Sequence, residues 1–393
     1  MTIDSAIVLA AGEGRRLRPL TKNRPKPMLP AARKPILEHV FDALIDAGVT
    51  DLSVVVGYQR NRVQSHFGPT YRNVPITYVV QDKQLGSGHA LECAEPANPE
   101  PVLVVYGDQL IDQKLVFDVL HEHQAGTATA TLGVVREADV RDYGGVLLAE
   151  DHAVRDIVEN PADDRNYALN AGVYAFEPAM FDTVRTTDRR SGELSLVDAL
   201  SNLLEEEASI RGVASNGTWI DATYPWDLLE IATDLLADAS STQPDISPES
   251  TIHESATINE PVLVSQDCVI GPGAVVGPNV SLGENVTIGS NTTVEQSVID
   301  TDTRIESGCT VLDCVTGHGT YIGPGTTVVG GPGDVEIDGQ IHHNERLGAV
   351  LADRVHDKGG VTYRPGTIVG TDVVIHAGST VGGTVEDDSE VYG

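Results

Sequence analysis

The pattern of apolar and polar residues changes its period once along the chain. Up to about residue 235, short apolar runs alternate with amphipathic stretches of helical period. The expected strands include Ala6–Ala10, Leu52–Gly57, Thr77–Val80 and Val102–Tyr106, and the expected helices include Ile36–Ala47 and Leu194–Glu205. Strands that alternate with helices predict an α/β domain with a mostly parallel sheet covered on both faces, which binds ligands at the carboxyl ends of its strands.

Beyond residue 250 the apolar positions recur every six residues. The first run is Ile252, Ile258, Val264, Ile270, Val276, Leu282, Ile288 and Val294. The same register returns at Ile299, Ile305, Val311, Ile322, Val328, Tyr363, Val369, Ile375 and Val381. A six-residue repeat with turn-forming Gly, Pro or Asn predicts a parallel β-helix, in which each hexad forms one face of a triangular coil. Residues 330–346 break this register and are expected to form a projecting loop.

The segment between the two patterns has neither period. Asp238–Ser250 is rich in Ser, Asp and Pro, which is typical of a linker. With 393 residues the chain is also too long for one ordinary core. We therefore expect an α/β domain over residues 1–237, a linker over 238–250 and a β-helix over 251–393.

The charge of the chain excludes some classes of binding partner. Its formal net charge is −32, and the residues after 240 carry 5 Lys+Arg against 22 Asp+Glu, a net of −17, which leaves −15 for the rest. Nucleic acid and anionic membranes would be repelled, so neither is an expected partner. The charge fits a halophilic protein, whose surface is screened by high salt. Since no apolar run reaches spanning length and no leader pattern opens the chain, we expect a cytoplasmic protein.

Against this acidic background, cations gather near the start. Three of the six lysines, Lys22, Lys26 and Lys34, lie within thirteen residues of one another. A strand leads into Gly12-x-Gly14, a loop whose backbone N–H groups can approach phosphate. The third glycine of a dinucleotide site is replaced by Leu17, and a P-loop is absent. Arg16 and Lys26 instead supply two fixed cations, which suit a reaction that releases pyrophosphate.

These motifs resemble those of the sugar-1-phosphate nucleotidylyltransferase family, and the resemblance extends over the first 235 residues. It implies a Rossmann-like domain in which Arg16 stabilises the β and γ phosphates and Lys26 holds the phosphate under attack. Nucleotide contacts are implied for Leu9, Ala10, Gly12, Gln81, Gly86 and Ser87, with Gln81 reading the pyrimidine edge. Substrate contacts, mostly to the sugar, are implied for Tyr106, Gly144, Glu159 and Asn170.

The resemblance also implies that Asp108 and Asp221 bind Mg²⁺. Two carboxylates from separate strand ends suit this hard ion, and in-line attack then needs alignment and charge neutralisation but no side-chain nucleophile. The chain departs from the family in two places. Asn160 and Pro161 stand where family members carry a lysine for the sugar phosphate, and Thr223-Tyr224 replaces Gly-Thr. The first departure puts sugar-phosphate affinity or substrate choice in question.

The domain order is similar to that of archaeal and bacterial bifunctional members, which acetylate glucosamine 1-phosphate and then uridylylate it. This similarity implies a left-handed β-helix that assembles as a homotrimer, UTP and N-acetylglucosamine 1-phosphate as substrates, and acetyl-CoA as a second co-substrate. The stretch Gly86-Ser-Gly-His-Ala90 is like that of the uridylyltransferases for this sugar. His318 and Tyr321 match the His-x-x-Tyr motif of the acetyl-transfer site, with His318 as the base.

Three alternatives stay open. The β-helix can be purely structural, with His318 and Tyr321 as solvent-facing residues on a glucose-1-phosphate thymidylyl- or uridylyltransferase. The chain can also bind sugar nucleotides as a regulator without turnover, although such a protein has no need for Arg16, Lys26 and two metal carboxylates together. The sequence does not decide between UTP and dTTP as the nucleotide, or which sugar phosphate is the second substrate.

Overall fold

The computed structural model describes residues 3–95, 100–136, 140–141, 143–163, 165–189, 192–238 and 245–393. These residues form two compact units. The first unit runs up to Glu13 and continues with Pro25–Met28 and Ile36–Asp221, and the second unit comprises Gly14–Arg24, Leu29–Pro35 and Ala222–Gly393. Of the predicted linker, residues 239–244 lie outside the described part of the chain, whereas Asp245–Ile246 form strand β15.

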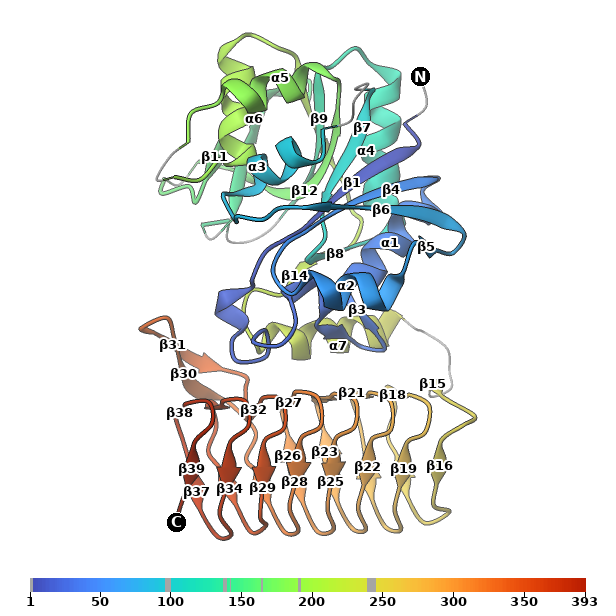
Figure 1. Cartoon of the computed structure of the whole chain (residues 1–393), viewed down its shortest axis with the longest axis vertical. Helices are drawn as coiled ribbons and strands as arrows, with labels where there is room; N and C mark the ends of the chain where they lie inside the picture. Colours follow the sequence, from blue (N-terminus) through green and yellow to red (C-terminus); the bar gives the residue numbers. More distant parts are fainter. Residues whose placement is uncertain are drawn as a thin grey trace. The chain divides into compact units, whose positions relative to one another are not determined.

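A ten-stranded sheet organises the first unit (Figure 1). Its path is β11-β10-β12-β7-β1-β4-β6-β5, with β9 joining β12 to β13. The strands are β1 (Ser5–Ala10), β4 (Asp51–Val56), β5 (Thr70–Tyr71), β6 (Val74–Val80), β7 (Val102–Tyr106), β9 (Ala130–Val135), β10 (Gly144–Leu148), β11 (Val154–Glu159), β12 (Ala168–Phe176) and β13 (Ile210–Ala214). The stretch β7-β1-β4-β6 and the pair β9-β13 are parallel. The expectation of a mostly parallel sheet was wrong because β12 runs antiparallel to β7, β9 and β10.

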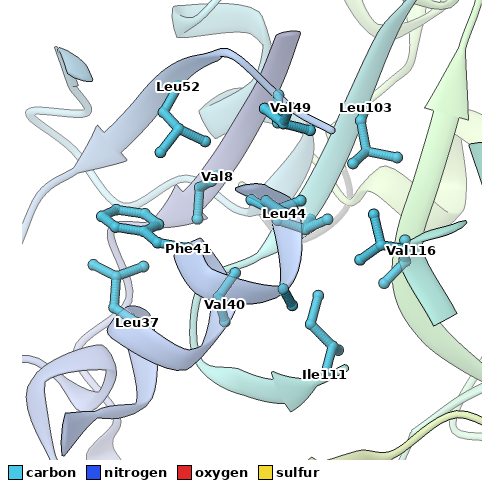
Figure 2. Close-up of a cluster of buried hydrophobic side chains, with 14 of the residues drawn as sticks. Val8, Leu37, Val40, Phe41, Leu44, Val49, Leu52, Leu103, Ile111 and Val116 are labelled. Atoms are coloured by element: carbon cyan, nitrogen blue, oxygen red, sulfur yellow. The ribbon is translucent and has the colours of Figure 1, made fainter. Parts of the chain in front are cut away.

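Helices cover both faces of this sheet. One face packs against α1 (Ile36–Asp46), α2 (Arg60–Phe67) and α4 (Gln113–Ala125), and the other against α3 (Ser87–Cys93), α5 (Ala179–Thr186) and α6 (Leu196–Glu205). In α1 the apolar residues Leu37, Val40, Phe41 and Leu44 recur at helical spacing and point into one cluster with Val8 and Leu52 of the sheet (Figure 2). The expected elements are present, and their observed bounds differ from the predicted ones by at most three residues.

The second unit is built on a left-handed parallel β-helix with three sheets (Figure 1). The first sheet contains β15 (Asp245–Ile246), β18 (Val262–Val264), β21 (Val280–Leu282), β24 (Ser297–Ile299), β27 (Cys314–Thr316), β32 (Ala349–Leu351), β35 (Thr367–Val369) and β38 (Thr384–Val385). The second contains β16 (Thr251–Ile252), β19 (Val269–Ile270), β22 (Thr287–Ile288), β25 (Arg304–Ile305), β28 (Tyr321–Ile322), β33 (His356–Asp357), β36 (Val374–Ile375) and β39 (Glu390–Val391). The third contains β17 (Thr257–Ile258), β20 (Val275–Val276), β23 (Thr293–Glu295), β26 (Thr310–Leu312), β29 (Thr327–Val328), β34 (Thr362–Tyr363) and β37 (Thr380–Val381).

The six-residue register is confirmed by burial. From Val264 to Val381, every residue predicted to point inward is at most 3 % exposed. The register break at residues 330–346 is a hairpin of β30 (Gly333–Ile337) and β31 (Gln340–Glu345). One inward position was not foreseen. Asp357 continues the register between Leu351 and Tyr363 and is fully buried, where it accepts hydrogen bonds from Thr326, Tyr363 and two backbone N–H groups.

Several shorter elements complete the two units. The first unit also holds a two-stranded ribbon of β8 (Gln109–Ile111) and β14 (Trp219–Asp221), and the 3₁₀ turn η2 (Lys26–Met28). In the second unit, α7 (Asp227–Asp238) lies against β21, β24 and β27, β2 (Pro30–Ala31) pairs with β3 (Lys34–Pro35), and η1 spans Arg15–Leu17. None of the described helices has the length and apolar character needed to cross a bilayer.

Candidate active site

Three charged residues of the first unit converge on one point. The Nζ atom of Lys26 lies 2.6 Å from Oδ1 of Asp221 and 3.2 Å from Oδ2 of Asp108. Strand register explains the proximity of the carboxylates: Asp108 directly precedes β8, and Asp221 pairs across the ribbon with Gln109, the first residue of β8. Two acids separated by more than a hundred residues in sequence are thus neighbours because β8 and β14 are paired.

Burial makes this charge cluster electrostatically strong. The side chain of Lys26 is only 11 % exposed, and that of Asp221 only 10 %. Burial alone would lower the pKa of Lys26, but the carboxylates of Asp108 and Asp221 outweigh that effect and raise the pKa. Lys26 therefore remains a cation at neutral pH. A buried, permanently charged ammonium can hold a phosphate oxygen as well as a carboxylate.

The predicted base-binding residues lie together at the end of β6. Gln81 follows this strand directly and is 4 % exposed, and its Nε2 atom donates to the carbonyl oxygen of Gly86 at 3.1 Å. Gly86 precedes α3 with a φ of +97°, and a Cβ atom there would lie 2.4 Å from the carbonyl oxygen of Leu194. The Ser87 hydroxyl accepts a hydrogen bond from the N–H of Leu196 at 3.0 Å. Only glycine fits at position 86.

The predicted sugar-binding residues also lie together. Gly144 of β10 pairs with Glu159 of β11, and a Cβ atom on Gly144 would lie 3.2 Å from that of Asn170 in β12. The amide of Asn170 donates to the hydroxyl of Tyr174 at 2.8 Å. Desolvation of its carboxyl group raises the pKa of Glu159, and the nearby Asp198 carboxylate raises it further. At the end of β7, burial raises the pKa of Tyr106 to about 12 and keeps its hydroxyl protonated.

The glycine-rich loop divides between the two units. Leu9 and Ala10 are buried in β1, so only their backbone groups remain for a nucleotide, while Gly12 is exposed just after the strand. Arg16 is exposed in η1, within the segment Gly14–Arg24 of the second unit. Its action on the same phosphates as Lys26 stays a prediction.

The predicted acetyl-transfer residues lie on the β-helix close to acids. The Nε2 atom of His318 is 3.6 Å from a carboxylate oxygen of Asp302, and its side chain is 49 % exposed. The hydroxyl of Tyr321 donates to Glu306 at 3.2 Å, and its ring stacks on that of His356 with centroids 4.5 Å apart. The structure therefore places both residues on one coil of the β-helix, His318 between β27 and β28 and Tyr321 at the start of β28, and each lies next to a carboxylate.

The sequence analysis missed one charged residue close to Lys26. The guanidinium of Arg24 lies 2.7 Å from Asp300 and 2.9 Å from Asp353, all within the second unit. Burial would lower the pKa of Arg24, but the two carboxylates raise it. Arg24 lies two residues before Lys26 in the sequence, so a cation at this position could have been noticed. Its pairing with Asp300 and Asp353 could not be predicted from the sequence, because only the coiling of the β-helix brings these two aspartates together.

A Rossmann-like domain with a lysine and two carboxylates at strand ends, followed by a β-helix, defines a sugar-phosphate nucleotidylyltransferase architecture. Residues 5–238 match the family described as nucleotidyl transferase, and residues 258–385 match the one described as GMPPB C-terminal domain. The chain belongs to the nucleotidyl transferase family and is a sugar-1-phosphate nucleotidylyltransferase with a C-terminal β-helix.

Individual relatives agree with this assignment. The "Bifunctional protein GlmU" of Methanococcus maripaludis strain C7 is 35 % identical over 98 % of this chain and 97 % of its own length. The "UTP--glucose-1-phosphate uridylyltransferase AglF" of Haloferax volcanii is 36 % identical over 56 % of this chain and 92 % of its own length. The fold is also similar to a crystal structure of UDP-glucose pyrophosphorylase complexed with UDP-glucose, with a TM-score of 0.55. The match spans 60 % of this chain and 100 % of that chain. Its sequence identity of 23 % makes it evidence for the fold alone.

Proposed function

We propose that this enzyme forms a UDP-sugar and pyrophosphate from UTP and N-acetylglucosamine 1-phosphate. The observation that carries the catalytic part is the convergence of Lys26, Asp108 and Asp221. UTP is supported by the relative AglF, which is named a UTP–glucose-1-phosphate uridylyltransferase, and the sugar by similarity to GlmU proteins over the whole chain. The stretch Gly86–Ala90 adds support, because it is like that of uridylyltransferases for this sugar.

In this proposal the reaction is a direct displacement. A phosphate oxygen of the sugar 1-phosphate attacks the α-phosphorus of UTP, and the bond between that phosphorus and the bridging oxygen to the β-phosphate breaks. The leaving pyrophosphate takes the bonding electron pair, and no covalent enzyme intermediate forms. Lys26 binds the phosphate under attack, Arg16 neutralises the departing charge, and backbone N–H groups after β1 hold the triphosphate.

The carboxylates of Asp108 and Asp221 fit a magnesium site. Both present oxygen atoms to a single cation, Lys26, and Mg²⁺ commonly binds to one or two carboxylates together with substrate phosphates. Bound there, the ion would supply charge neutralisation for the reacting phosphates. Asp108, with a side chain 32 % exposed, is the more accessible of the two carboxylates.

The substrate end of the proposal rests on the cluster of Gly144, Glu159 and Asn170, which we assign to the sugar. Tyr106 lies nearby through its ring contact with Tyr174, at a centroid distance of 6.1 Å. Asn160, which replaces the family's lysine, adopts a left-handed φ of +48°, and its N–H donates to the carbonyl of Tyr143. Asn160 therefore forms a bend just after β11, and its hydrogen bond continues the pairing of β10 with β11. We propose that Lys26 carries more of the sugar-phosphate binding here.

One assay panel tests the substrate assignment. Pyrophosphate release is measured with UTP and dTTP, each crossed with glucose, glucosamine and N-acetylglucosamine 1-phosphates, with Mg²⁺ and with EDTA. We expect the highest kcat/KM for UTP with N-acetylglucosamine 1-phosphate and no turnover in EDTA. A clear preference for glucose 1-phosphate would overturn the proposed sugar.

The variant Asp108→Ala tests the metal assignment. We expect pyrophosphate release to fall about 1,000-fold or more, since one carboxylate and its ion are lost together. Asp112→Ala is a matched control, because that residue caps α4 and is not assigned to the site. Unaltered turnover in Asp108→Ala would refute the magnesium site.

We propose acetylation of glucosamine 1-phosphate by acetyl-CoA as a second activity, supported by the similarity to proteins named bifunctional. His318 would take the proton of the attacking amine, the nitrogen would bond to the acetyl carbon, and the CoA thiolate would leave. Free thiol is measured with dithionitrobenzoate, and His318→Ala should abolish its release while nucleotidyl transfer continues. Absence of thiol release from the unaltered enzyme would leave the β-helix a structural domain.

We also propose that the β-helices assemble as a homotrimer, as the family resemblance implies. Light scattering should then give three times the chain mass of 41.7 kDa. A mass equal to one chain would refute this assembly.

A further inference from the structure

The side-chain amide of Gln81 has both of its N–H groups engaged. Its Nε2 atom lies 3.1 Å from the carbonyl oxygen of Gly86 and 2.9 Å from Nδ1 of His89. A carbonyl oxygen can only accept, so the nitrogen of the amide must face Gly86. The same nitrogen then points its second N–H at His89, whose Nδ1 must act as the acceptor.

These two hydrogen bonds determine which ring nitrogen of His89 carries the proton in the neutral imidazole. If Nδ1 accepts, a neutral imidazole carries its proton on Nε2, the atom that lies 3.8 Å from the sulfur of Cys93 one helical turn away. An amide can in principle turn over by 180° and exchange its oxygen for its nitrogen. Here that rotation would set the oxygen of Gln81 against the carbonyl oxygen of Gly86, which can only accept, so the rotated amide is disfavoured.

The carbonyl of Gly86 is itself held in place. The N–H of Gly88 donates to the oxygen of Leu194 at 2.8 Å, and the N–H of Leu194 donates to the oxygen of Leu85 at 2.7 Å. A Cβ atom at residue 86 would lie 2.4 Å from the oxygen of Leu194, so the two segments are in close contact. The carbonyl oxygen that accepts from the Gln81 amide is therefore not free to turn away.

One hydrogen-bonding atom of Gln81 remains. In the described parts of the chain, no residue donates a hydrogen bond to its Oε1. Among pyrimidines, uracil and thymine carry an N–H at ring position 3, whereas cytosine has an unprotonated nitrogen there that only accepts. An acceptor presented to this edge pairs with uracil or thymine and opposes the ring nitrogen of cytosine.

We infer that His89 is a positioning residue for nucleotide specificity: it holds the Gln81 amide with its oxygen toward the base and so selects uridine or thymidine over cytidine nucleotides. This inference rests on the proposed function, in which Gln81 reads the base. Because Gln81 is only 4 % exposed, a mismatched base would leave polar groups unpaired in a desolvated place. Sites of this kind reject such analogues strongly, so we expect a preference for UTP over CTP of about 100-fold or more.

Four variants test the role of His89. His89→Phe keeps a ring but has no acceptor, and His89→Ala removes the ring. His89→Asn places an amide oxygen where Nδ1 stands and should restore part of the specificity. Cys93→Ala is the matched control, because it changes the neighbour of the other ring nitrogen and leaves Nδ1 intact. Far-UV circular dichroism and thermal melting confirm that each variant is folded.

The readout is the ratio of kcat/KM for UTP to that for CTP, at a fixed sugar phosphate. Losing one hydrogen bond that fixes the amide should lower this ratio about tenfold in His89→Phe and His89→Ala. Cys93→Ala should keep the unaltered ratio, and His89→Asn should lie between. An unchanged ratio in His89→Phe, or no preference for UTP in the unaltered enzyme, would overturn the inference while leaving nucleotidyl transfer intact.

Calorimetric titration with UTP and CTP, in the presence of Mg²⁺, separates this inference from the proposed function. A binding preference for UTP that weakens in His89→Phe would support the role of His89 even if no sugar phosphate is turned over. If the enzyme binds both nucleotides equally, the inference is wrong whatever the assay of turnover shows.

Discussion

Two cations two residues apart, Arg24 and Lys26, are each buried between a pair of aspartates, yet they belong to different units. Arg24 is bound by the β-helix acids Asp300 and Asp353, and Lys26 by Asp108 and Asp221. The difference lies in how completely the carboxylates are enclosed. The side chains of Asp300 and Asp353 are 9 % and 6 % exposed, whereas that of Asp108 is 32 % exposed.

The acids around Arg24 also have further partners. Asp353 accepts from the N–H of His318 and from the amide of Asn23, and Asp300 accepts from the N–H of Thr301. Such a closed set has little capacity left for a ligand, so its effect is structural. The Lys26 cluster keeps an accessible carboxylate. A buried ion cluster is thus suited to chemistry when one of its carboxylates stays open to a ligand, and to stability when all of them are enclosed.

The largest effect is expected for Lys26→Met, which tests whether the Lys26 cluster serves catalysis. Without the ammonium, the phosphate under attack loses its cation, and we expect kcat/KM for pyrophosphate release to fall about 1,000-fold. Lys83→Met, which removes an exposed lysine, is the control and should retain full activity. If Lys26→Met keeps more than about a tenth of the activity, the cluster is structural like that of Arg24.

The second test is Arg24→Met. Removing one partner of a buried ion cluster leaves uncompensated carboxylates, so we expect the second unit to lose about 3–5 kcal/mol of unfolding free energy. The chain has two tryptophans, and only Trp226 belongs to the second unit. Urea unfolding followed by fluorescence in a Trp219→Phe background therefore reports on the second unit.

Arg33→Met provides the matched control for Arg24. Arg33 pairs with Asp245 at 2.5 Å within the same unit, but both side chains are nearly half exposed. Such exposed pairs contribute less than about 1 kcal/mol. Equal losses in Arg24→Met and Arg33→Met would contradict the idea that enclosure makes the Arg24 cluster strong.

The smallest expected effect concerns Asp357, an acid without a cation partner among its described contacts. Burial raises its pKa in the folded protein above the ordinary value, so folding favours the neutral carboxyl. The stability that this preference provides is present below the ordinary pKa and is lost as pH rises through the raised one. Relative to Asp357→Asn, the unaltered protein should thus gain about 1 kcal/mol or less between pH 7 and pH 4.

Asp372 supplies the control with the opposite sign. A hydrogen bond from Arg354 lowers its pKa, so its contribution to stability is present above the ordinary pKa and is lost on acidification. Unfolding free energies of the unaltered protein and both Asn variants are measured from about pH 2.5 to 7 by the same fluorescence method, because the contribution of Asp372 is lost only as pH falls below the ordinary pKa. The same sign of the pH dependence for the two positions would contradict the assignment of burial as the dominant cause at Asp357.

Much of the architecture was predictable because it depends on local periodicity. The inward residues from Val264 to Val381 follow from a six-residue repeat, since each coil of the β-helix repeats the environment of the previous one. Strand β7 was predicted with its observed bounds, Val102–Tyr106. The antiparallel course of β12 was not predictable in the same way, because alternation shows that a segment is a strand but not which strand lies beside it.

The periodicity of the sequence was sufficient to predict an α/β region followed by a β-helix, because both are encoded in local patterns. Which charges meet depends on the tertiary structure. Asp221 reaches Lys26 through the register of β14 on β8, and Arg24 reaches its two aspartates through the coiling of the β-helix. Likewise, the chain order does not show that His89 holds Gln81. Contacts between residues distant in sequence depend on strand pairing and packing, and a local pattern carries no information about either.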